Sequence, residues 1–215
     1  MTEAEWLAAT DPRPMLEFLR AKASDRQLRL FACAYCRAVR DSLHLLPGTA
    51  VAVAERYADG PADDEDLASE RRGAPFPNEY AEWVVGTSAY EGAWQGVDWL
   101  ASACDLMKSD PDAIRHCPIP LDEVVARSVL FLRDIFGPRP FRRVNIAPEV
   151  LAWNDGAVSR IAEGIYEDRN FELLPKLADA LEDAGCTNAE LLAHLRGPGP
   201  HVRGCWAVDL VLGKS

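Results

Sequence analysis

The chain has 215 residues, of which 48% are hydrophobic and 27% are charged, and its formal net charge at pH 7 is −11. A chain of this length can form one domain of moderate size or two small ones, each with a buried core. Its composition excludes a disordered polyelectrolyte. The acidic excess argues against a general nucleic-acid binder, because contact with a phosphate backbone requires clustered lysine and arginine.

Apolar residues recur every three or four positions along most of the chain, and this spacing predicts helices. The first begins at Thr2, where Glu5 stands three residues later as in a capping box. The predicted helices cover residues 2–9, 15–19, 24–43, 51–57, 80–104, 121–136, 148–165, 174–184, 187–195 and 201–212. No segment alternates with a period of two, so we predict an all-α protein, a helical bundle or irregular α-array of about nine helices.

Two segments interrupt this helical pattern. Residues 59–78 combine a run of carboxylates with two arginines and three prolines, which predicts an acidic, solvated loop. Residues 111–120 contain three prolines and predict a connector. We therefore expect an N-terminal helical half over residues 1–110 and a C-terminal half over residues 121–215, packed as one compact unit.

Short motifs stand near both ends of the chain. They are TEAEWL at 2–7, MLEFLR at 15–20, SDR at 24–26, LRDIFG at 132–137, WNDG at 153–156, LADALEDAGC at 177–186, RGPG at 196–199 and HVRGCW at 201–206. Together they resemble the signatures of an uncharacterised bacterial family with many paralogues in single genomes. The resemblance implies a shared fold and no known activity, and Leu195 departs from the cysteine of the family pattern. Residues 60–120 do not match the family signatures. This would be the part in which paralogues differ, as expected of a partner-specific surface.

Soft ligands are grouped near the C-terminus of the chain. Cys186, His194, His201 and Cys205 could converge on one tetrahedral zinc ion, with the last two one turn apart on the predicted final helix. The alternative, which we favour, is buried cysteines with capping or surface histidines. We therefore expect no cofactor, and zinc is the alternative.

A second candidate metal site starts from the Cys-x-x-Cys pair Cys33 and Cys36. His116 and Cys117 could complete it, although some 80 residues intervene. The pair lies inside a predicted helix and lacks the turn of a zinc knuckle, so we favour two buried core thiols over zinc or redox chemistry.

Two groups of basic residues are candidate anion sites. Arg196, His201 and Arg203 flank a predicted helix start, where backbone N–H groups favour anions, although proline is also a routine helix starter. The second group is the sole nucleic-acid candidate, with intramolecular counter-charge as its alternative. It consists of Arg133, Arg139, Arg142 and Arg143.

No complete catalytic motif occurs: the sequence has no Gly-x-Ser-x-Gly, His-Glu-x-x-His or Walker loop. We therefore predict a non-catalytic adaptor protein that acts through contacts with an unidentified protein partner. We expect no contact with a membrane, and the acidic balance argues against nucleic acid as a partner. Six cysteines and an acidic start without a signal peptide predict the cytoplasm. One alternative is a metal- or anion-dependent enzyme or sensor that uses the C-terminal Cys/His/Arg cluster. The other is a regulator that contacts nucleic acid through residues 133–143.

Overall fold

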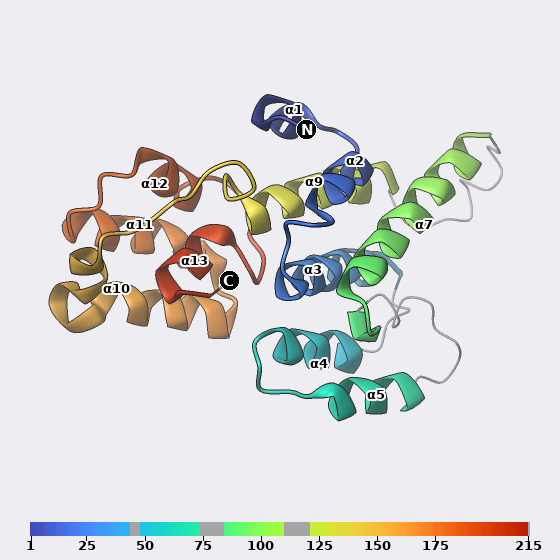
Figure 1. The fold of residues 1–215 in the computed structure, drawn as a ribbon, viewed down its shortest axis with the longest axis horizontal. Coiled ribbons are helices and arrows are strands. Elements are labelled where there is room, and N and C mark those ends of the chain that lie inside the picture. Colours follow the sequence, from blue (N-terminus) through green and yellow to red (C-terminus); the bar gives the residue numbers. More distant parts are fainter. Residues whose placement is uncertain (44–47, 74–83, 110–120, 215) are drawn as a thin grey trace. The chain divides into compact units, whose positions relative to one another are not determined.

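The computed structural model of the chain describes residues 1–43, 48–73, 84–109 and 121–214. These residues contain eleven α-helices and no strand, which confirms the all-α prediction, although about nine helices were expected (Figure 1). They pack into two compact units, Met1–Leu132 and Arg133–Ser215. The boundary falls inside helix α9 (Leu121–Phe136) and not in the predicted connector at 111–120, which lies outside the described residues. No helix in the described ranges is long and apolar enough to cross a membrane.

The N-terminal unit is built around helix α3, which packs against α4 and α7. Its other helices are α1 and α2, followed later by α5 and most of α9. The predicted capping box at the start of α1 is present, since the Glu5 N–H donates to Thr2 Oγ1 at 3.2 Å and the Thr2 N–H donates to Glu5 Oε2 at 2.7 Å. The bounds are α1 Glu3–Ala8, α2 Pro12–Leu19, α3 Asp25–Leu43, α4 Gly48–Ala58, α5 Asp64–Gly73 and α7 Ala89–Ser109.

Helix α5 occupies much of the segment 59–78 that the sequence predicted as an acidic loop. Asp63 starts it, because its Oδ1 accepts hydrogen bonds from the N–H groups of Glu65 and Asp66, both at 3.0 Å. Carboxylates fill the first turn and two arginines fill the last, an order that the helix dipole favours. The charge run is therefore helical where it is described; residues 74–78 lie outside the described part.

A buried ion pair joins α3 to α4 within the N-terminal unit. The guanidinium of Arg37 donates to both carboxylate oxygens of Glu55, at 3.0 and 2.7 Å. Only 3% of the Glu55 side chain is exposed. A carboxylate this deeply buried needs its partner, because an unpaired charge in the core is strongly destabilising.

The C-terminal unit packs α10 against α11 and α13, and α11 against α12. Its core contains fully buried leucines of α11 and α12 and the buried ring of Trp206. Gly185 stops α11: its φ is +91°, and the next N–H, that of Cys186, donates to the Leu181 carbonyl at 2.8 Å. The elements are α10 Pro148–Asp168, η1 Phe171–Leu173, α11 Leu174–Asp183, α12 Ala189–Leu195 and α13 Trp206–Leu212, preceded by the last residues of α9.

Helix α10 is interrupted at the WNDG motif. Asn154, Asp155 and Gly156 have positive φ angles of +49°, +54° and +76°, so a local turn interrupts the helix that was predicted over residues 148–165. Asparagine and aspartate visit this left-handed region more readily than most residues. Trp153, which precedes the turn, is 37% exposed and does not fill the core. Arg160 donates to the carbonyl oxygens of Asn154 and Asp155 at this turn.

Candidate metal centre

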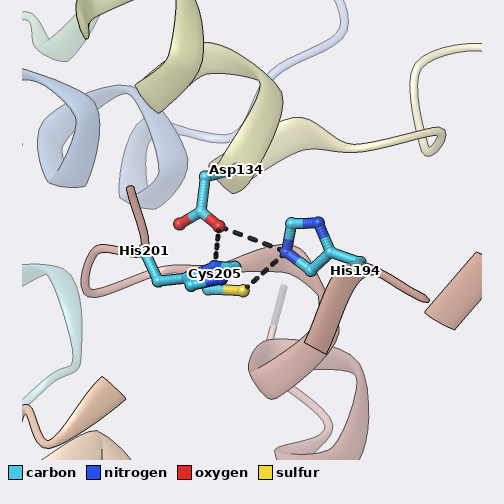
Figure 2. A group of neighbouring side chains, drawn as sticks. All are labelled: Asp134, His194, His201 and Cys205. Carbon is cyan, nitrogen blue, oxygen red and sulfur yellow. Dashed lines mark hydrogen bonds and ion pairs between the residues drawn. The ribbon is translucent and has the colours of Figure 1, made fainter. Parts of the chain in front are cut away.

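Four side chains converge inside the C-terminal unit: Asp134, His194, His201 and Cys205 (Figure 2). One nitrogen, oxygen or sulfur atom from each lies within 4.8 Å of the corresponding atom of every other. Asp134 belongs to the last turn of α9, His194 to the last turn of α12, His201 to the loop that follows, and Cys205 is the N-cap of α13. The arrangement therefore gathers four separate segments at one point.

Asp134 lies at the centre of this cluster. Its Oδ1 is 2.7 Å from His201 Nδ1 and 3.1 Å from His194 Nε2, while its Oδ2 accepts a hydrogen bond from the Val202 N–H at 2.8 Å. The side chain is only 3% exposed. Burial raises the pKa of Asp134, but hydrogen bonds from the two histidines outweigh burial and leave the pKa below its usual value. The structure therefore holds an ionised carboxylate in a buried position.

His201 is oriented from both sides of its ring. Its Nε2 lies 3.3 Å from the carbonyl oxygen of Gly197, and because a carbonyl can only accept a hydrogen bond, Nε2 carries the hydrogen. That contact leaves Nδ1 facing the Asp134 carboxylate. Burial lowers the pKa of His201, but the hydrogen bond and charge of Asp134 raise it more, so the pKa lies above the usual value. The ring also packs edge-on to that of His194, with 5.0 Å between centroids.

The loop before α13 differs from the sequence prediction. The final helix was expected to begin at His201, but it begins at Trp206, so His201 and Cys205 do not share a helix face. Instead, a glycine-proline turn with a cis Gly199–Pro200 bond leads into His201. Gly199 has a φ of +82°, and a Cβ there would lie 2.9 Å from the His201 backbone nitrogen. Glycine is required at that position for backbone reasons.

Cys205 is completely buried at the start of α13. Burial raises the pKa of its thiol well above the usual value, and the negative charge of Asp134 raises it further. The backbone N–H groups of Ala207 and Val208 form hydrogen bonds with it, which favours a thiolate. Because burial and Asp134 raise the pKa of the thiol, a nearby cation would be needed to stabilise the thiolate.

The contacts of His194 distinguish a metal site from a catalytic triad. Its Nε2 lies 3.2 Å from Cys205 Sγ and 3.1 Å from Asp134 Oδ1. In a triad the nucleophile and the carboxylate contact opposite nitrogens of the imidazole. One nitrogen takes the proton of the nucleophile, and the carboxylate at the other nitrogen stabilises the resulting imidazolium. Here both contact the same nitrogen, and the sulfur is inaccessible to a substrate. The geometry suits atoms that share one central ion.

The predicted ligand set is therefore only partly reproduced by the cluster. His194, His201 and Cys205 come together, but Cys186 lies just after the end of α11 and is not among the clustered residues. Asp134 was missed. It lies some 60 residues before the others in a predicted helix, and its one sequence signal is a charged residue between the apolar Leu132 and Ile135.

The Cys33 and Cys36 pair lies on α3 in the N-terminal unit, and both side chains are completely buried. Burial raises the pKa of both thiols. This placement agrees with two core thiols. The other two members of that candidate site, His116 and Cys117, lie outside the described residues.

The predicted anion-binding residues are engaged separately. Arg196 pairs with Asp179 at 2.7 Å and with Glu182. The Arg203 guanidinium lies 4.4 Å from the centroid of the Tyr166 ring. His201, the third member, contacts Asp134 as described above, so these side chains do not form one cradle.

The predicted nucleic-acid cluster divides in two. Arg133 is half-buried on α9, and burial lowers its pKa. Arg139, Arg142 and Arg143 instead line a pocket in the C-terminal unit. Arg142 also bonds both carboxylate oxygens of Glu190 at 2.7 Å, which is the intramolecular counter-charge that the alternative predicted.

Comparison with protein-family models, curated proteins and solved structures finds no match for this chain. The interpretation of the cluster therefore depends on its own geometry.

Proposed function

We propose that the C-terminal unit binds one zinc ion through Asp134 Oδ1, His194 Nε2, His201 Nδ1 and Cys205 Sγ. The observation that carries this proposal is the convergence of two nitrogens, one oxygen and one sulfur within 4.8 Å. This donor set suits zinc, which binds imidazole, carboxylate and thiolate. Tetrahedral zinc would hold these atoms about 3.3–3.6 Å apart. Two contacts, at 3.1 and 3.2 Å, are close to that spacing, and the third, between Asp134 and His201 at 2.7 Å, is shorter.

Neighbouring groups support the same assignment. Metal-binding side chains need hydrogen bonds on their remaining atoms, because these fix the tautomer and the orientation. His201 Nε2 contacts the Gly197 carbonyl, and Asp134 Oδ2 accepts a hydrogen bond from the Val202 N–H. His201 Nδ1 and Asp134 Oδ1 therefore remain for the metal. The N–H groups at the start of α13 stabilise the sulfur of Cys205 as a thiolate.

Four protein ligands in a buried cluster would leave zinc no open coordination position, which is typical of structural sites rather than catalytic ones. Such a site supports a non-catalytic binding or adaptor protein that acts through protein contacts, and we keep this as the proposed function. We propose the cytoplasm as its location, where thiols stay reduced. The described cysteines, namely Cys33, Cys36, Cys186 and Cys205, are thiols and not disulfides.

Metal analysis of two matched cysteine variants tests the proposal. The protein is purified without chelator, and its zinc content is measured by mass spectrometry for the wild type, Cys205→Ser and Cys186→Ser. We expect about one zinc per chain in the wild type and in Cys186→Ser, and loss of zinc in Cys205→Ser, because only Cys205 is in the cluster. A wild-type protein without zinc after refolding with zinc present would refute the proposal.

Cobalt substitution covers the case in which Cys205→Ser fails to fold. Tetrahedral Co²⁺ bound to a thiolate has a characteristic visible and near-ultraviolet absorption. We expect this absorption in the refolded wild type and in Cys186→Ser. If the Cys186→Ser change removes the absorption, the ligand set proposed here is wrong.

A further inference from the structure

The C-terminal unit also contains a pocket of about 340 Å³ that is separate in its residues from the metal cluster. The loop after α9 provides Arg139, Arg142, Arg143 and Asn145, the first turn of α13 provides Asp209, and Lys214 follows that helix. Four cationic side chains thus face one carboxylate. In a chain with a net charge of −11, this is a local reversal of charge.

Hydrogen-bonded turns hold the loop side of the pocket in place. The N–H groups of Arg139 and Arg142 donate to the carbonyls of Phe136 and Pro138, at 3.1 and 3.0 Å. The preceding Gly137 packs so closely on Trp206 of α13 that a Cβ would lie 2.5 Å from the indole ring. The loop and α13 are therefore in tight contact, and the arginines are presented by an ordered backbone.

The charges of this pocket are only partly compensated by the protein. Arg142 is paired with Glu190, and the Lys214 ammonium lies 4.8 Å from the centroid of the Tyr166 ring. Arg143 is exposed, and no described residue forms a hydrogen bond or ion pair with it. Its guanidinium fork thus remains available for an oxyanion, which it can bind through two parallel hydrogen bonds.

We propose that this pocket binds a small organic oxyanion, with Arg143 as its principal contact. A volume of about 340 Å³ is at the lower end of small-molecule pockets. Val144 and Leu210 add apolar surface, and Asn145 adds an amide that can orient the ligand. Nucleic acid is disfavoured, because its interfaces extend over far larger surfaces. The proposal does not depend on zinc.

An NMR titration of the whole chain with two dianions tests the proposal. Inorganic phosphate and succinate are added separately, and the backbone amide signals of Asn145 and Gly213, which line the pocket, are followed. We expect saturable shifts of these signals with at least one dianion, and the stronger binder identifies phosphate or carboxylate as the preferred group. No saturable shift with either dianion would overturn the proposal.

Two charge-removing variants locate the contact. We expect Arg143→Gln to weaken binding about tenfold, because glutamine can keep one of the two hydrogen bonds but loses the other, charge-assisted one. Lys176→Gln is the matched control, since Lys176 is also exposed and forms no ion pair with a described residue. Equal weakening by both variants would mean that only diffuse charge attracts the anion, and would refute the pocket. Tighter binding of a single-stranded oligonucleotide than of either dianion would also refute it, in favour of a nucleic-acid surface.

Discussion

Asp134→Asn is the substitution that tests the cluster most directly. Asparagine keeps the shape of the side chain but removes its charge and one of its two acceptor oxygens. If the amide oxygen stays near His194 and His201, the amide nitrogen faces the Val202 N–H, and two donors oppose each other. If the amide turns over, the donor faces the two histidines instead. Neither orientation can satisfy all three contacts of the carboxylate.

The expected loss follows from burial and from the number of partners. The carboxylate is only 3% exposed and has contacts at 2.7, 2.8 and 3.1 Å. Removing one partner of a buried ionic group costs about 3–5 kcal/mol. We therefore expect the C-terminal unit to lose about that much free energy of unfolding, together with its zinc.

Hydrogen–deuterium exchange measured by mass spectrometry can assign the loss to the right part of the chain, because it reports the free energy of opening peptide by peptide. We expect faster exchange within Arg133–Ser215, with peptides of Met1–Leu132 as an internal reference. The matched control is Asp183→Asn, since Asp183 is exposed and forms no ion pair with a described residue. The reasoning is wrong if Asp134→Asn costs less than about 1 kcal/mol, or no more than the control.

Three further predictions concern pH, a buried ion pair and thiol reactivity. Because the folded pKa of His201 is raised, the metal-free C-terminal unit should be stabilised below about pH 6.5 and should lose this stability as the pH rises through the folded pKa. The zinc-loaded unit should instead lose stability on acidification. Urea titrations that show the same pH trend for both forms would refute this prediction. Arg37→Ala leaves the buried Glu55 carboxylate without this partner and should cost the N-terminal unit about 3 kcal/mol in urea unfolding; a loss near zero would contradict the assigned pair. Iodoacetamide should label the half-buried Cys186 at least about tenfold faster than the buried Cys36, as peptide mass spectrometry can show; equal rates would contradict the burial.

Local sequence patterns predicted those structural features whose physical cause lies within a few residues. The capping box of Thr2 was predicted, because it needs only neighbouring backbone groups, and the predicted helix over residues 174–184 ends at a left-handed Gly185 for an equally local reason. The start of α13 was predicted five residues too early. His201 and Val202 are in phase with the helix, but a glycine-proline turn and the contacts of Asp134 hold them in a loop.

Helix periodicity and residue chemistry are local properties, so the sequence predicted the all-α class and most helix positions. It also named His194, His201 and Cys205 as candidate zinc ligands, although buried cysteines with capping or surface histidines were the favoured interpretation. Tertiary packing brings Asp134 into the cluster and leaves Cys186 outside it. The same packing places Arg139, Arg142 and Arg143 in one pocket with residues of α13. These relations join segments some 60 residues apart, and packing in the C-terminal core alone brings those segments together.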